Sequence, residues 1–286
     1  MAVGRQREKQ PRRVWYLKVL CAFAAGMLAV LLLSLPTGAL FHIWDGEGPA
    51  LYEDTAGGPF PEKGALPAEG QGMGVETSCV RQVLDAPFID QREKYPTGCE
   101  SVSAVMALQY AGVDITVEEF IDGYLPQGEA PHRDGSGTWV GANPWKEFLG
   151  SPYEESGWGC YAPVITGALE RVLQEEDGVS LEVRELEGEE LSTLCRDYVE
   201  NGMPVIVWAT ISMEEPVPST TFVLEDTGEL FTWMYPLHCL LLTGECGGSY
   251  LFNDPLEGKN VAYPKEQVET AYAGVGMQAV VLVPAG

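Results

Sequence analysis

Residues 88–112 decide the fold, with the sequence FIDQREKYPTGCESVSAVMALQYAG. Apolar side chains at 102–106 fall at helical spacing and share one stripe, and Gly112 is typical of a residue that ends a helix. The turn residues at 96–98 place the start of this helix at or beside Cys99. A cysteine at a helix N-terminus favours a thiolate, because unpaired backbone N–H groups and the helix dipole stabilise an anion there. The plainer interpretation is that Cys99 is a small apolar residue at a helix start.

Three residues outside this helix complete a candidate catalytic set. Gln91 stands eight residues before Cys99, and its side-chain amide can donate a hydrogen bond to a developing oxyanion. His238 lies at the start of an apolar strand pattern, 139 residues after Cys99, and Asp254 follows 16 residues later at the end of the next strand pattern. A hairpin brings two such positions together, so the set supplies a nucleophile, a base and an orienting carboxylate.

Each member of the set also has an ordinary interpretation. A lone histidine at a strand start is commonly just a hydrogen-bonded polar residue, Asn253-Asp254-Pro255 suits a turn, and Gln91 suits the surface. The order and spacing argue for the set as a whole. A cysteine at a helix start, a glutamine shortly before it, and a histidine and a carboxylate far downstream are typical of the papain-like arrangement.

The residues around these positions resemble the C39-like peptidase family, the bacterial relatives of the bacteriocin-processing cysteine peptidases. The matching segments span roughly residues 80–283, and Gly98-Cys99-Glu100 and Asn253-Asp254-Pro255 are the specific ones. The resemblance implies a papain-like α+β fold, a cysteine peptidase activity and no metal or cofactor. The site residues that it implies are Cys99 as nucleophile, His238 as general base, Asp254 as its orienting carboxylate and Gln91 at the oxyanion hole.

The rest of the domain reads as helices followed by strands, an α+β pattern in which a helical part packs on an antiparallel sheet. The expected helices are 99–111, 117–124, 160–173, 189–201 and 264–272. The expected strands are 81–88, 180–183, 204–211, 221–224, 230–233, 237–243, 249–252 and 277–283. Residues 125–159 are expected to form a long loop, the kind of segment that is usually functional or a lid. Its tryptophans either wall a substrate cleft or pack within the loop, and they are Trp139, Trp145 and Trp158.

The N-terminal part predicts a membrane anchor. An uncharged apolar run at 19–35 lies within a segment, 19–41, that is long enough to span a bilayer as a single transmembrane helix. The basic tail at 1–18 predicts a cytoplasmic N-terminus, so the linker at 42–79 and the C39-like domain at 80–286 would lie outside the cell. A cleaved signal peptide, which would make the protein secreted, is the alternative.

Charge and cysteine content narrow the classes of partner. The chain of 286 residues has a net charge of −25. The tail at 1–18 has a net charge of +5, so residues 19–286 have a net charge of −30. A body this acidic argues against nucleic acid and against attraction to anionic lipid, and it leaves solubility or a cationic partner as its cause. No spacing suits a zinc site, and disulfides are allowed but not indicated. The seven cysteines are Cys21, Cys79, Cys99, Cys160, Cys195, Cys239 and Cys246.

These features predict a bacterial, membrane-anchored, extracellular cysteine peptidase that hydrolyses a peptide or protein substrate. The bacteriocin-processing relatives lie on the cytosolic side of ABC transporters and cut after a double glycine. The outward orientation expected here argues against that substrate. Two alternatives stay open: a papain-like transferase or amidase acting on cell-surface peptides, and a catalytically silent surface module that binds a peptide.

Overall fold

The computed structural model describes residues 83–176 and 178–286. The expected tail at 1–18, anchor at 19–41 and linker at 42–79 lie outside the described residues. Within the described ranges, no helix combines the length and the apolar character needed to cross a bilayer.

Six antiparallel strands form the central sheet of the domain. They are β5 Leu181–Glu187, β6 Val205–Thr210, β9 Leu237–Cys246, β10 Ser249–Asp254, β11 Gly258–Pro264 and β12 Gln278–Pro284. Their order across the sheet is β11-β10-β9-β6-β12-β5. The antiparallel sheet expected from the sequence is therefore present.

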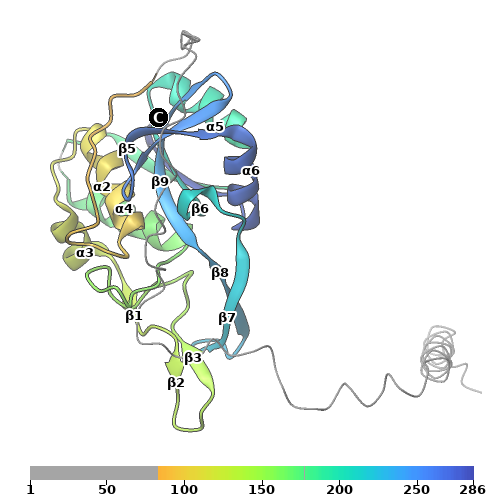
Figure 1. Ribbon diagram of the computed structural model, residues 1–286. Helices are drawn as coiled ribbons and strands as arrows, with labels where there is room; N and C mark the ends of the chain where they lie inside the picture. Colours follow the sequence, from red (N-terminus) through yellow and green to blue (C-terminus); the bar gives the residue numbers. More distant parts are fainter. Residues whose placement is uncertain (1–82, 177) are drawn as a thin grey trace, which may run out of the picture. The chain divides into compact units, whose positions relative to one another are not determined.

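Helices pack on both faces of this sheet, where the sequence predicts only a helical part on a sheet (Figure 1). One face holds α2 Cys99–Tyr110, α3 Val117–Tyr124 and α4 Ala162–Glu175. The other face holds α5 Leu191–Asp197 and α6 Lys265–Gly274. Each face has its own apolar cluster, so the sheet separates two halves of the core.

The strand β6 shows why its sequence is apolar without a break. Ile206 and Trp208 pack in the cluster on the α2 face, whereas Val205, Val207 and Ala209 pack in the cluster on the α5 and α6 face. A strand covered on both faces buries its side chains whichever way they point. All six residues of β6 are buried, which confirms the strand that the apolar run predicts.

The helix α2 is buried around its circumference, beyond the one apolar stripe expected for it. Its residues from Cys99 to Leu108 are all buried, because α2 packs against the sheet, α3 and α4. Ser103 Oγ donates to the Cys239 carbonyl oxygen at 3.2 Å and ties the helix to β9. The helix ends at Tyr110, and Gly112 follows with φ +91°.

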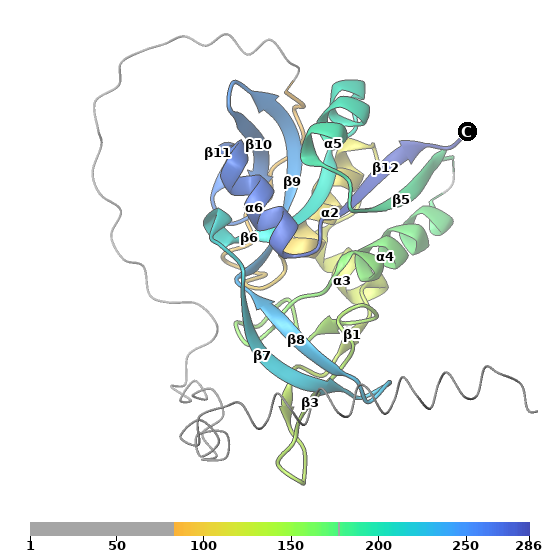
Figure 2. The same ribbon diagram turned by 90° about the vertical axis from the view of Figure 1, so that its right-hand side faces the viewer.

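Residues 125–159 are not a structureless loop, contrary to the prediction. They contain β1 Gln127–Gly128, β2 His132–Arg133, β3 Trp139–Gly141 and β4 Phe148–Leu149. The strand β3 pairs in parallel with β7 Val217–Leu224, which pairs with β8 Leu230–Tyr235, so a second sheet forms in the order β2-β3-β7-β8. Figure 2 shows this sheet reaching beyond the end of β6. The pairing joins distant segments, which a local sequence pattern cannot reveal.

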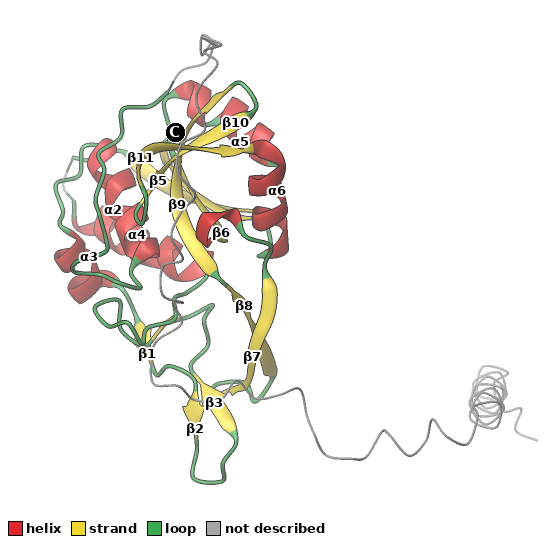
Figure 3. Cartoon of the chain, viewed as in Figure 1, coloured by secondary structure: helices red, strands yellow, loops and turns green. Residues whose placement is uncertain are grey.

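Two other expectations differ from the structure, and one strand was not expected. The described part of the expected strand at 81–88 is loop (Figure 3), held to β9 by the Leu84 N–H and the Thr243 carbonyl oxygen at 2.8 Å. The expected helix at 189–201 is broken at Tyr198 into α5 and a short 3₁₀ turn. The strand β11 was not expected, because its residues alternate in exposure at the sheet edge and carry little apolar signal.

Candidate active site

Cys99 is the first residue of α2 and is 7% exposed. Its thiol donates to Glu100 Oε2 at 3.2 Å, and a backbone hydrogen bond from Cys239 also reaches the sulfur. Burial, followed by the charge of Glu100, raises the pKa of the Cys99 thiol well above its ordinary value. The helix N-terminus alone would favour a thiolate, but burial and the adjacent carboxylate outweigh it, so the thiol is the stable form in this buried site.

His238 and Asp254 form a buried pair. His238 is the second residue of β9, and Asp254 is the last residue of the neighbouring strand β10. Asp254 Oδ1 lies 2.8 Å from His238 Nε2, and both side chains are 1% exposed. The hairpin therefore brings the two residues together, as their spacing predicts.

The Asp254 carboxylate has further partners that fix it. Leu256 N–H donates to Oδ1 at 2.9 Å, and Tyr263 Oη donates to Oδ2 at 2.6 Å. Burial alone would raise the pKa of Asp254, but the charge and hydrogen bond of His238, with the bonds from Tyr263 and Leu256, lower it to about 2. The carboxylate is thus held ionised next to the imidazole ring.

Replacing Tyr263 by phenylalanine is expected to destabilise the fold by about 1.5–3 kcal/mol, the range for a hydrogen bond to a charged group. The variant leaves Oδ2 of a buried carboxylate without its tyrosine donor. Urea denaturation at neutral pH measures the loss. The matched control is Tyr250→Phe, which removes a similar bond, Tyr250 Oη to Glu269 Oε1 at 3.0 Å, away from Asp254. Because Glu269 is exposed whereas Asp254 is buried, the control is expected to lose less stability. A loss for Tyr263→Phe no greater than for the control would show that burial at Asp254 does not strengthen the bond.

Gln91 is buried in the segment before α2, and it is 1% exposed. Its Nε2 donates to the Pro96 carbonyl oxygen at 3.0 Å, and its backbone N–H donates to the Pro255 carbonyl oxygen at 3.1 Å. The second bond ties Gln91 to the turn that follows Asp254. One amide hydrogen is used by Pro96 and one is left, so the role of Gln91 at an oxyanion hole stays a prediction.

Two residues of the site were not predicted from the sequence. Glu100 Oε1 accepts from the Cys160 N–H at 2.9 Å, and burial raises the pKa of this carboxyl group, which also interacts electrostatically with His238. The signal for Glu100 was an acidic residue directly after the candidate nucleophile in an otherwise uncharged helix. Tyr263 lies on the unexpected strand β11, so nothing in the sequence pointed to it.

Two residues thus connect the cysteine at the helix start with the buried histidine–aspartate pair. Cys239, the neighbour of His238 on β9, donates its backbone N–H to the Cys99 sulfur, and Glu100 accepts from the Cys99 thiol and interacts electrostatically with His238. A family model described as Peptidase_C39 like matches residues 83–280. The chain belongs to the C39-like peptidase family. It is a cysteine peptidase, as its sequence predicts.

One solved structure shares the fold of this C39-like peptidase. The crystal structure of a C39-like peptidase from Bacillus anthracis is 25% identical, has a TM-score of 0.59, and covers 71% of this chain and 98% of its own.

No protein with a curated description matches the chain. Two further solved structures are similar at lower identity. A double glycine motif protease from an AMS/PCAT transporter, solved with its leader peptide, is 16% identical, with a TM-score of 0.40 over 72% of this chain and 97% of its own. The peptidase domain of Streptococcus ComA, a bifunctional ABC transporter of a quorum sensing pathway, is 14% identical, with a TM-score of 0.38 over 69% and 97%.

Aromatic side chains of the C39-like peptidase gather beside Glu100. A Cβ atom at Gly159 would lie 2.5 Å from Glu100 Oε1 and 3.5 Å from the Trp233 ring. The Trp233 ring contacts Trp158 and Tyr161, each with centroids 5.6 Å apart. Trp158 and Trp145, two of the three tryptophans singled out in the sequence, belong to this cluster, since the Trp145 ring stacks on Tyr161 with centroids 4.4 Å apart. Trp139 instead packs against the Arg133 guanidinium. Whether Trp145 and Trp158 wall a substrate cleft stays a prediction.

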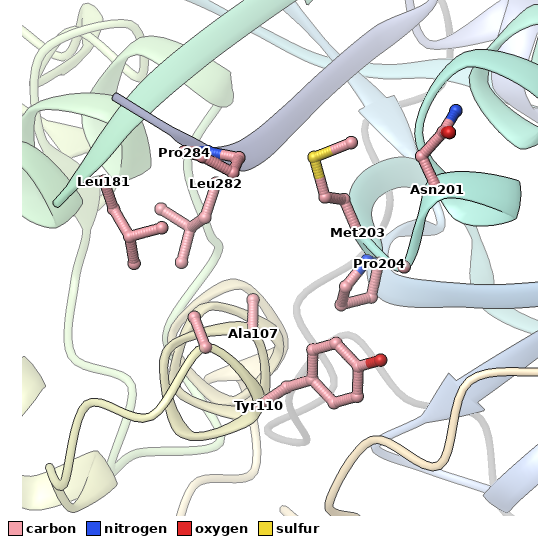
Figure 4. A pocket seen from close by; sticks show the side chains of 10 residues that line it. Ala107, Tyr110, Leu181, Asn201, Met203, Pro204, Leu282 and Pro284 are labelled. Carbon is pink, nitrogen blue, oxygen red and sulfur yellow. The ribbon is translucent and has the colours of Figure 1, made fainter. Parts of the chain in front are cut away.

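A cavity of about 280 Å³ lies away from these residues of the peptidase, at the opposite end of α2 from Cys99. Ala107 and Tyr110 line it from α2, facing Leu282 and Met203 (Figure 4). None of the candidate site residues lines this cavity, so it is not the active site. Among residues 83–176 and 178–286, no group of three or more His, Cys, Asp or Glu side chains is arranged to hold a metal ion.

Proposed function

We propose that this cysteine peptidase hydrolyses peptide bonds through Cys99, His238 and Asp254, and that it acts outside the cell from an N-terminal membrane anchor. The observation that carries the catalytic part is the buried hydrogen bond between His238 Nε2 and Asp254 Oδ1, at 2.8 Å, in a member of a cysteine peptidase family. This bond occupies Nε2 and leaves Nδ1 as the ring nitrogen that can take a proton from Cys99.

The proposed reaction uses the side chains of Cys99, His238 and Gln91 and the backbone N–H of Cys99. His238 Nδ1 takes the Cys99 proton, and the thiolate attacks the carbonyl carbon of the substrate peptide bond. The oxyanion accepts hydrogen bonds from the Cys99 backbone N–H, which has no acceptor within its own helix, and from the second amide hydrogen of Gln91. His238 then protonates the leaving amine, and water hydrolyses the thioester.

Incubating the full chain with a peptide library tests the catalytic proposal. Mass spectrometry is expected to find hydrolysis products with the wild type and none with Cys99→Ala, whereas Cys195→Ala, which removes a buried cysteine of the opposite core cluster, retains activity. An added amine separates the hydrolase from a transferase, because a transferase would give amide adducts in place of free carboxylates. A folded wild type that yields neither product would contradict catalysis and favour the surface peptide-binding module.

The membrane location rests on sequence features that lie outside the described residues. The basic tail at 1–18 and the apolar segment at 19–41 support an anchor with its N-terminus inside the cell. Protease treatment of intact cells is expected to digest residues 80–286, and a membrane fraction is expected to retain the chain. Protection of the domain until the cells are lysed would contradict the outward orientation, and release of the chain into the medium would favour the secreted alternative.

A further inference from the structure

Glu100 is a buried carboxylate that the proposed reaction does not use. It is 1% exposed, and both oxygens are engaged: Oε1 accepts from the Cys160 N–H at 2.9 Å and Oε2 from the Cys99 thiol at 3.2 Å. None of the ion pairs formed by the described residues includes Glu100. Burying a carboxylate without an ion-pair contact is costly, so a role in packing alone does not account for it.

The surroundings of Glu100 hold its carboxylate against the sulfur. Trp208 Nε1 donates to the Cys160 carbonyl oxygen at 2.8 Å, so β6 fixes the residue whose N–H binds Oε1. Gly159 has φ +129°, and a Cβ atom there would lie only 2.5 Å from Oε1. A side chain at position 159 would therefore be strained and would displace the carboxylate. The Trp208–Cys160 hydrogen bond and the absence of a side chain at Gly159 thus both hold the Glu100 carboxylate in its position.

The titratable groups that face Glu100 come from three parts of the fold. They are Cys99 on α2, Cys160 and Tyr161 at the start of α4, and His238 and Cys239 on β9. Of these groups only His238 can carry a positive charge. Burial raises the pKa of Glu100, and burial together with the charge of Glu100 raises the pKa of Cys99. Two adjoining acids of this kind titrate as a pair.

We propose that Glu100 is a positioning residue for Cys99: its carboxylate holds the thiol proton in the buried site and must itself be protonated before the thiolate forms. This inference rests on the proposed function, because Glu100 has this role only if Cys99 is the nucleophile. On activation the thiol proton moves to His238 Nδ1, and Glu100 takes up one proton from solvent. Formation of the Cys99 thiolate in this way takes up one proton from solvent. A rising pH therefore disfavours it, until the pH is high enough for the Cys99 thiol to lose its proton directly to solvent.

The variant Glu100→Gln tests this role. It keeps an oxygen to accept from the Cys160 N–H, and it replaces the charged oxygen beside the sulfur with an N–H donor. Alkylation of Cys99 by iodoacetamide is expected to rise about tenfold or more at neutral pH, because each unit of lowered thiol pKa gives tenfold more thiolate. The difference between wild type and variant is expected to narrow as the pH falls and Glu100 becomes protonated. The rates are measured on the full chain between about pH 5 and 8, with the label located by mass spectrometry.

The matched control is Glu93→Gln, which removes an exposed carboxylate from the segment before α2 and is expected to leave the Cys99 rate and its pH profile unchanged. If Glu100 is only structural, Glu100→Gln would expose Cys160 and Cys239 to iodoacetamide together with Cys99, and the pH profile of Cys99 labelling would not change. That result overturns the proposal. Equal Cys99 rates in wild type and Glu100→Gln at every pH also overturn it.

A second variant covers the case in which Glu100→Gln does not fold. Glu100→Asp withdraws the carboxylate from the sulfur by one methylene group, and a smaller rise in the same direction is expected; no rise overturns the proposal. The parent hypothesis is tested separately, by His238→Ala. If Cys99 labelling is indifferent to that change, the proposed triad fails, whatever Glu100→Gln does.

Discussion

Replacing His238 by alanine is expected to lower kcat/KM for peptide hydrolysis by about 10²–10⁴-fold, the range that a general base contributes. The ring is 1% exposed and is bound to Asp254 at 2.8 Å, so it is held in one orientation. Without it, burial and the Glu100 charge keep the pKa of Cys99 high, and no other described histidine lies at the site to remove the proton. Steady-state kinetics with the best library peptide at neutral pH measure the loss.

The control for this experiment is His132→Ala. His132 lies on β2 of the second sheet, half-exposed and 3.5 Å from Glu129, so its removal is expected to leave kcat/KM unchanged. Denaturation curves establish that both variants are folded. A folded His238→Ala protein with wild-type kcat/KM would remove His238 from the reaction.

The variant Asp254→Asn is expected to lower the free energy of unfolding at pH 7 by about 2 kcal/mol, because the pKa of Asp254 falls from 3.8 to about 2 on folding. Burial opposes this shift, and the His238 charge, its hydrogen bond and those from Tyr263 and Leu256 outweigh burial. A pKa that is lower in the folded state stabilises the fold above pH 3.8, and this stability is lost as the pH falls through about 2. The wild type is therefore expected to lose stability over that window more steeply than the variant.

Chemical denaturation across that pH window, compared with pH 7, tests the prediction. The matched control is Asp226→Asn, since Asp226 pairs with Lys146 at 2.7 Å but at the exposed surface, where an ion pair contributes about 1 kcal/mol or less. Equal stability of Asp254→Asn and wild type at pH 7, with the same dependence on pH, would mean that the buried pair does not stabilise the fold.

The sequence predicted those parts of the fold that depend on local pattern. The unbroken apolar run of β6 and the hairpin of β9 and β10 were expected because burial on both faces and a Gly-Gly turn leave clear local signals. The same hairpin brought His238 to Asp254. The helix α2 was expected from its apolar spacing, and its burial on all sides depends on α3, α4 and the sheet, which are set by the whole chain.

The parts that were missed depend on contacts between distant segments. The strand β3 exists because it pairs with β7, and β11 exists because it pairs with β10 at the sheet edge. Tyr263 could not be connected to Asp254 without that edge strand. Glu100 was visible in the sequence beside Cys99, but its burial follows from Cys160 and Gly159, which approach it from the start of α4.

Selective alkylation of Cys99 in the full chain tests the central claim, that this cysteine is a nucleophile activated by His238. Cys160, Cys195 and Cys239 serve as internal controls, since all three are buried cysteines of the same domain. With limiting iodoacetamide near neutral pH, Cys99 is expected to be labelled before the other three. His238→Ala is expected to slow Cys99 to their rate. Labelling of Cys99 that is no faster than that of the other buried cysteines, or that is indifferent to His238, would contradict the account.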